Sequence, residues 1–144
     1  MKKIFLMAVS SLLIMTIAKA DPNDKIKQSF NKTFPNAVSV KWNESDAGYL
    51  VSFSQAGTLT KVNYDKQGNF VSSLRYYHEK DLPLKIMMAL KNKYDGKEIY
   101  GATEFTNADQ VIYQVTLKDT KYWYIVNSSV DGDLTLQDKY KKSE

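Results

Sequence analysis

The chain has 144 residues, with 20 Lys and Arg against 16 Asp and Glu, a single His and no Cys. This composition excludes a disulfide scaffold and a zinc site built from clustered His and Cys. The small charge excess provides no basic field of the kind that nucleic acid requires, so no nucleic-acid partner is expected.

The first twenty residues have the pattern of a cleaved secretory signal. Lys2 and Lys3 precede an apolar run over residues 4–18, and Ala18-Lys19-Ala20 is an A-x-A cleavage site. The alternative is a retained N-terminal membrane anchor, but the apolar run is short for a bilayer span. We therefore expect residues 1–20 to be a signal peptide and the protein to be exported, either periplasmic or secreted.

Removal of the signal changes the charge argument, because three of the 20 basic residues, Lys2, Lys3 and Lys19, leave with it. The mature chain then has 17 basic and 16 acidic residues, and it carries no further apolar run long enough to span a membrane. Residues 21–144 suit one compact domain that is stabilised by its core.

In the first half, a helix should start near Asp21-Pro22-Asn23-Asp24, where an Asp or Asn can cap it. Its apolar stripe is Ile26, Phe30 and Phe34, and Pro35 ends it. Alternating apolar residues and polar turns then predict four strands, over residues 38–42, 49–54, 58–64 and 70–76.

The second half has the same order. Leu82-Pro83 opens a helix that Asp95-Gly96 ends, with the glycine as a left-handed cap. Strands are predicted over residues 99–105, 111–117, 121–127 and 134–137, and the polar C-terminal tail is expected to fray. The pattern of the strand over residues 99–105 is poor, which leaves its pairing open.

The two halves also share a spacing. Tyr49 and Tyr113 are 64 residues apart, and so are Gly68 and Gly132. The predicted fold is therefore α+β, a tandem repeat of a helix plus about four antiparallel strands, over roughly residues 21–78 and 79–140. Because the strands alternate apolar and polar residues, we expect the helices to cover one sheet face and the other face to be open.

Several of these motifs resemble the PepSY-like family of exported Bacteroidetes proteins, also described as beta-lactamase-inhibitor-like. They are Phe34-Pro35-Asn36-Ala37, Val40-Lys41-Trp42, the alternation of Tyr49, Val51 and Phe53, the spacing of Val62, Tyr64, Asp65 and Gly68, and Leu82-Pro83 opening a helix that ends at Tyr94. The resemblance covers the whole mature chain. It implies helices packed on an antiparallel sheet, no assigned catalytic residues, and a binding or inhibitory role by analogy of fold.

The sequence offers little catalytic or metal-binding chemistry. The single histidine, His78, stands in a polar connection without a strained nucleophile turn near any Ser, so we interpret it as a solvated loop residue. Asp131, Asp133 and Asp138 could offer oxygens to calcium, but no Glu closes the loop, and Asp-Gly is typical of a hairpin turn. We expect no catalytic residue, no metal site and no cofactor.

The open sheet face is the candidate binding site. Strict alternation places Phe70, Leu74 and Tyr76 toward the helices, and therefore Arg75 and Tyr77 outward. The strand over residues 121–127 leaves open whether Trp123 or its neighbours Tyr122 and Tyr124 face solvent. With Trp123 outward, the predicted partner-binding residues are Trp123, Tyr77, Arg75, Leu50, Ile112 and Ile125.

The leading hypothesis is an exported, non-enzymatic module that binds or inhibits an envelope protein or protease through the open sheet face. The alternative is a binder of a small ligand or envelope polymer, such as peptidoglycan or a peptide, in a groove between the repeats. A third possibility is a structural protein that self-associates through its sheet face, and the sequence leaves the oligomeric state open.

Overall fold

The structure is a computed structural model that describes residues 23–143, so the predicted signal peptide lies outside the described residues. The elements in chain order are α1 (Asp24–Thr33), β1 (Val38–Ser45), β2 (Gly48–Gln55), β3 (Thr58–Tyr64), β4 (Phe70–Tyr77), the 3₁₀ turn η1 (Glu79–Asp81), α2 (Leu84–Lys93), β5 (Glu98–Asn107), β6 (Val111–Lys118), β7 (Tyr122–Ser128) and β8 (Leu134–Lys141).

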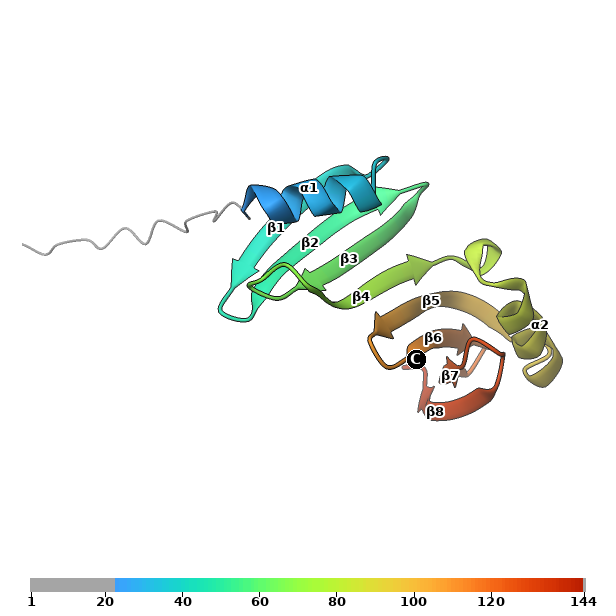
Figure 1. The fold of residues 1–144 in the computed structure, drawn as a ribbon. Helices are drawn as coiled ribbons and strands as arrows, with labels where there is room; N and C mark the ends of the chain where they lie inside the picture. Colours follow the sequence, from blue (N-terminus) through green and yellow to red (C-terminus); the bar gives the residue numbers. More distant parts are fainter. Residues whose placement is uncertain (1–22, 144) are drawn as a thin grey trace, which may run out of the picture.

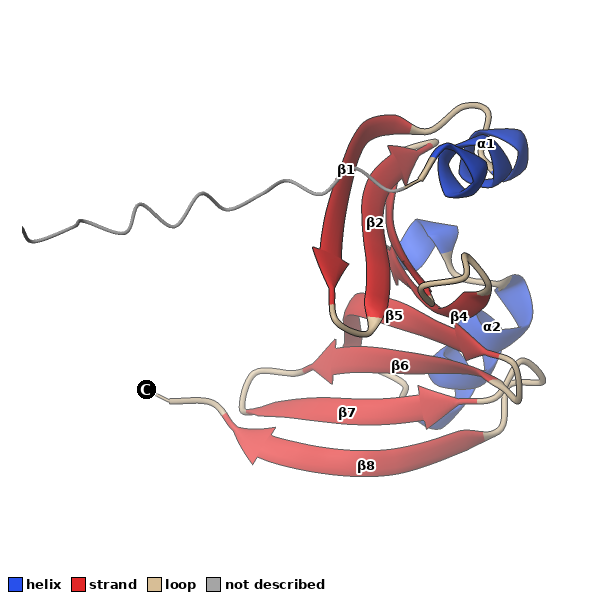
Figure 2. Cartoon of the chain, turned by 60° about the vertical axis from the view of Figure 1, so that its left-hand side comes forward, coloured by secondary structure: helices blue, strands red, loops and turns tan. Residues whose placement is uncertain are grey.

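The eight strands form one antiparallel sheet in which the spatial order is the chain order, β1 to β8 (Figure 1). Short hairpins join consecutive strands, apart from the β4–β5 connection, which contains η1 and α2. The predicted antiparallel sheet with two helices is therefore confirmed, and the described chain is mostly sheet. In Figure 2 the strands β1 and β2 run across the direction of β6, β7 and β8, so the sheet is strongly twisted.

Both helices lie on the same side of the sheet (Figure 2). The helix α1 is capped by Asn23, whose Oδ1 accepts a hydrogen bond of 3.0 Å from the backbone N–H of Ile26, as the sequence predicted for a cap. The helix α2 carries Leu90 and Ile86 on its buried side. Within residues 23–143, no helix is long and apolar enough to cross a membrane.

The first core lies between α1 and strands β1–β3. Phe30 of α1 packs against Phe53, with ring centroids 5.0 Å apart, and against Trp42 at 5.3 Å. Phe34 closes the same aromatic group at 4.7 Å from Phe53. The predicted stripe of α1 and the inward alternation of β2 thus meet in one buried cluster.

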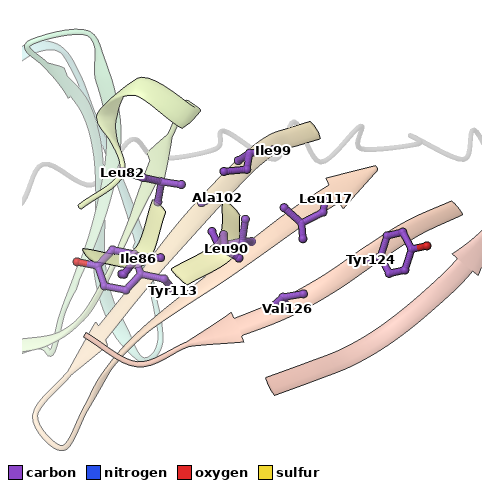
Figure 3. Packing of buried hydrophobic residues seen from close by; sticks show 10 residues of the cluster. Leu82, Ile86, Leu90, Ile99, Ala102, Tyr113, Leu117, Tyr124 and Val126 are labelled. Atoms are coloured by element: carbon purple, nitrogen blue, oxygen red, sulfur yellow. The ribbon is translucent and has the colours of Figure 1, made fainter. Parts of the chain in front are cut away.

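The second core lies between α2 and strands β5–β7 (Figure 3). Ile86 and Leu90 lie over the strands, where the buried residues alternate, as Val115 and Leu117 do on β6. The two cores are separate clusters of buried residues, each beneath its own helix. The strip of sheet between them, on β4, therefore has no helix above it.

Three strands differ from prediction by more than one residue at one end. The strand β1 was predicted over residues 38–42 but continues to Ser45. The strand β5 spans Glu98–Asn107, longer than the predicted residues 99–105, and pairs on both sides, with β4 and with β6. The C-terminal tail was predicted to fray after Gln137, but β8 continues to Lys141. That prediction was wrong because β8 pairs along the whole of β7, so backbone hydrogen bonds hold its polar residues in place.

The β6–β7 turn is organised by Asp119. Its Oδ1 accepts the backbone N–H groups of Lys121 and Tyr122 at 2.8 and 2.7 Å, and its Oδ2 accepts the hydroxyl of Tyr124 at 2.7 Å. The Tyr124 hydroxyl first, and then these backbone donors, hold the pKa of Asp119 at about 2.

This network predicts a loss of stability in acid. The folded-state pKa lies below the ordinary value of 3.8, so folding favours the carboxylate, and stability should fall as the pH drops from about 4 toward about 2. Asp119→Asn should flatten that part of the profile of melting temperature against pH. The exposed Asp95→Asn variant is the control and should retain the parent slope. An unchanged slope in Asp119→Asn would contradict this assignment.

Candidate functional site

The candidate site is the sheet face opposite the helices, called the open face below. Strand pairing places Leu50 of β2, Ile112 of β6, and Trp123 and Ile125 of β7 on this face. Their neighbours Val51, Tyr113, Tyr124 and Val126 point to the buried cores instead. The structure therefore resolves the orientation of β7, with Trp123 facing the open side.

Arg75 and Tyr77 are not on the open face, so the predicted alternation of β4 is wrong. Tyr64 pairs with Phe70 but Asn63 pairs with Ser72, which makes Val71 an extra residue, a β-bulge. The bulge reverses the parity of the rest of the strand. Tyr77 consequently packs on the second core, Arg75 faces Glu104 on the helix side, and Leu74 and Tyr76 take the open-face positions.

The centre of the open face is an apolar hollow. Leu74 and Tyr76 of β4 stand beside Phe105 of β5 and Ile112 of β6, and a cavity of about 320 Å³ opens among them. Its remaining lining residues are polar: Thr103, Gln114 and Asn127. We call this feature the central hollow.

Around Trp123 the open face carries a second group, called here the Trp123 corner. Tyr100 meets the Trp123 ring edge to face at 5.1 Å, and Tyr140 is its cross-strand neighbour on β8. Tyr100 is 61% exposed and Tyr140 is 53% exposed. The Nζ of Lys118 lies 5.1 Å from the Tyr100 ring, and that of Lys142 lies 4.8 Å from the Trp123 ring.

Four open-face residues were not predicted from the sequence: Leu74, Tyr76, Phe105 and Tyr100. The first two were assigned to the wrong face because of the bulge at Val71. Phe105 and Tyr100 belong to β5, where a second irregularity between Ile99 and Gly101 interrupts the alternation. The strand β6 alternates regularly on either side of Tyr113, and β5 pairs with it. The pairing with β6 was therefore the one signal that could have assigned the β5 residues to a face.

A separate groove of about 500 Å³ lies on the helix side, between α1 and the uncovered strip on β4. Phe34, Val62 and Phe70 form apolar walls, while Arg75 and Glu104 face it from β4 and β5. This groove corresponds in position to the one that the alternative hypothesis requires.

Glu104 is the buried charge of this region, only 8% exposed. Its Oε2 accepts the Tyr77 hydroxyl at 2.9 Å, and its Oε1 accepts the Thr106 hydroxyl at 3.3 Å. Burial, and then hydrogen bonding to Glu104, raise the pKa of Tyr77 and of Tyr113. The hydroxyl groups therefore compensate this carboxylate inside the fold.

The other residues considered for chemistry have structural roles. His78 is exposed and precedes η1 without a side-chain cap bond. Asp131 belongs to the β7–β8 turn and pairs with Lys85 at 2.7 Å, while Gly132 takes a positive φ of 86°. Within residues 23–143, no three His, Asp or Glu side chains gather in a group that could hold a metal ion.

No protein-family model matches the chain, and no curated protein matches it either. Solved structures do. A BLIP-like protein from Bacteroides fragilis superposes with a TM-score of 0.66 at 18% identity, covering 86% of this chain and 89% of its own. The fold is that of the BLIP-like proteins.

Two further Bacteroides structures support this assignment of fold. A DUF2874 family protein from Bacteroides ovatus gives a TM-score of 0.63 at 19% identity, covering 85% of this chain and 89% of its own. A candidate periplasmic protein from Bacteroides eggerthii gives 0.62 at 15% identity, covering 85% and 90%. At these identities the likeness extends to the fold alone.

Proposed function

We propose that this protein is an exported, non-enzymatic binding module that holds a protein partner of the cell envelope through the open face. The observation that carries the proposal is the apolar band that runs across an uncovered sheet face, from Tyr76 and Leu74 through Phe105 to Ile112. Contiguous apolar surface of this kind marks interaction sites.

The composition of the face suits an interface. The central hollow can receive one side chain of a partner, and the Trp123 corner supplies aromatic residues of the types that dominate binding energy. Of the sequence-predicted residues, Trp123, Ile112, Ile125 and Leu50 remain in this proposal, with Trp123 as the main anchor. The fold of the BLIP-like neighbours is consistent with protein binding.

The test is capture of envelope proteins by the immobilised chain from residue 21 onward. Trp123→Ala should weaken binding of a captured partner by about 2 kcal/mol, while the free energy of unfolding should change by less than about 1 kcal/mol. Affinity would be measured by calorimetry with the purified partner, and stability by urea denaturation.

The matched control is Phe70→Ala, an exposed aromatic residue at the lip of the helix-side groove. It should leave the affinity unchanged. If Trp123→Ala unfolds the protein or binds as tightly as the parent, Trp123 is not the anchor. If Phe70→Ala alone abolishes binding, the open-face proposal fails.

The helix-side groove is the second candidate, for a small ligand or an envelope polymer such as a peptide. Its combination of apolar walls, Phe34 and Phe70, with the polar groups of Arg75 and Thr106 favours it. Thermal-shift screens with envelope sugars and peptides, repeated on Phe70→Ala, would identify such a ligand. A mass that rises with concentration in light scattering would instead favour self-association through the sheet face.

The organisation of the chain forms part of the same proposal. We take residues 1–20 as a cleaved signal peptide and residues 21–144 as one PepSY-like domain that arose as two repeats, about 21–78 and 79–140. The candidate periplasmic neighbour supports export to the envelope. Mass spectrometry of the protein purified from its host would test the cleavage after Ala20.

A further inference from the structure

The carboxylates of the open face lie away from the central hollow. Among Asp and Glu of the described chain, only Glu98 of β5 and Asp138 of β8 occupy strand positions that face this side. Glu98 is at the start of its strand and pairs with Lys118 at 3.0 Å. Asp138 is on the edge strand. The central hollow is therefore lined without any acidic side chain.

Lysines, in contrast, are retained on this face. Lys41 on β1 and Lys61 on β3 take open-face positions, opposite Ser52 and opposite Leu74. The Nζ of Lys61 lies 5.6 Å from the Tyr76 ring, at the edge of the central hollow. Within residues 23–143 neither of these two lysines has a carboxylate within ion-pair distance.

Several lysines of the turns and helices do have a carboxylate partner. Lys66 pairs with Glu44 at 2.7 Å, Lys85 pairs with Asp131, and Lys97 lies 3.8 Å from Asp119. Lys118 on the open face is likewise paired, with Glu98, so Lys41 and Lys61 are the strand lysines of this face whose charge is left for a partner.

A face of this composition selects its partner by charge. Positive charge next to an apolar surface attracts an acidic surface and disfavours a basic one. We infer that the open face docks an acidic protein segment, which places an apolar side chain in the central hollow and an Asp or Glu side chain against Lys61. This inference rests on the proposed function and names the chemistry of its partner.

Nucleic acid is also anionic, but the open face suits it less well. The strands place only lysines there, without the Arg that reads phosphates in a bidentate manner, and the hollow between them is apolar. The experiment below includes single-stranded DNA as a competing probe.

The experiment selects binders from a displayed library of random peptides against the chain from residue 21 onward. Each enriched peptide is retested on Phe105→Ala, which opens the central hollow, and its net charge is determined. We expect the peptides that depend on Phe105 to be acidic and to carry a large apolar residue. Affinities are then measured at low and high salt.

Charge reversal gives the second readout. Lys61→Glu should weaken binding of an acidic peptide by about tenfold or more, and added salt should weaken the parent complex. Lys32→Glu on α1, an exposed lysine on the helix side, is the control and should change affinity by less than about twofold.

The outcomes separate the two proposals. The enriched peptides that depend on Phe105 could lack an acidic excess, or Lys61→Glu could leave their affinities unchanged. Either result would overturn the inference of an acidic partner and leave the proposed function standing. If no enriched peptide depends on Phe105, both the acidic partner and the proposed binding through the open face are contradicted. Tight binding of single-stranded DNA that Lys61→Glu abolishes would replace the protein partner with nucleic acid.

Discussion

Phe53→Ala is expected to lower the free energy of unfolding by about 4 kcal/mol. Phe53 is 1% exposed. It contacts the ring of Phe30 in α1 and the ring of Phe34 at the C-terminal end of that helix. Its removal leaves a cavity at the centre of the first core, which the surrounding strands can fill only in part. The loss should appear in urea denaturation followed by the fluorescence of Trp42, which packs on the same core.

The control is Leu59→Ala on the neighbouring strand. Leu59 is 44% exposed and lies on the open face, so its truncation should cost less than about 1 kcal/mol. If Phe53→Ala were no more costly than Leu59→Ala, the assignment of the first core would be wrong.

Gly48→Ala should be comparably severe, at about 4 kcal/mol. Gly48 opens β2 with a φ of +146°, a conformation that side chains rarely adopt, and a Cβ there would overlap the carbonyl oxygen of Tyr64 on β3. Backbone strain and steric overlap therefore add. The hairpin between β1 and β2 cannot relieve the overlap without moving β3, because β2 pairs with both neighbours.

Gly57→Ala separates these two causes. Gly57, in the next hairpin, also has a positive φ of +80°, but nothing lies within 4 Å of a Cβ added there. It should cost only about 1 kcal/mol, from the backbone conformation alone. Thermal unfolding of the two variants measures the difference, and equal losses would show that the contact with Tyr64 contributes nothing.

Most of the sheet could be predicted from alternation. On β2 and β7 the inward residues form unbroken period-two rows, such as Val51 and Phe53 or Tyr124 and Val126, and the structure buries them. The cap at Asn23 and the turn glycine Gly132 follow equally local rules. Where one residue determines its own geometry, the sequence is sufficient.

The candidate site could be predicted from the sequence less completely than the sheet, for a physical reason. A β-bulge adds a residue to one strand only in relation to its partner, so the extra Val71 is defined by the pairing of Tyr64 with Phe70 and not by β4 itself. Arg75 and Tyr77 changed face for that reason. Trp123, Ile112, Ile125 and Leu50 lie on the predicted face because their strands keep regular register through these positions.

The meander order of the sheet, described above, also bears on the rate of folding. Each strand pairs only with its neighbours in sequence, and only the β4–β5 pairing spans an intervening helix. Sheet contacts in this chain therefore have short sequence separations, and little loop-closure entropy is lost before each hairpin forms. We expect stopped-flow refolding faster than that of sandwich proteins of similar length, with closure of β4 on β5 as the slow step.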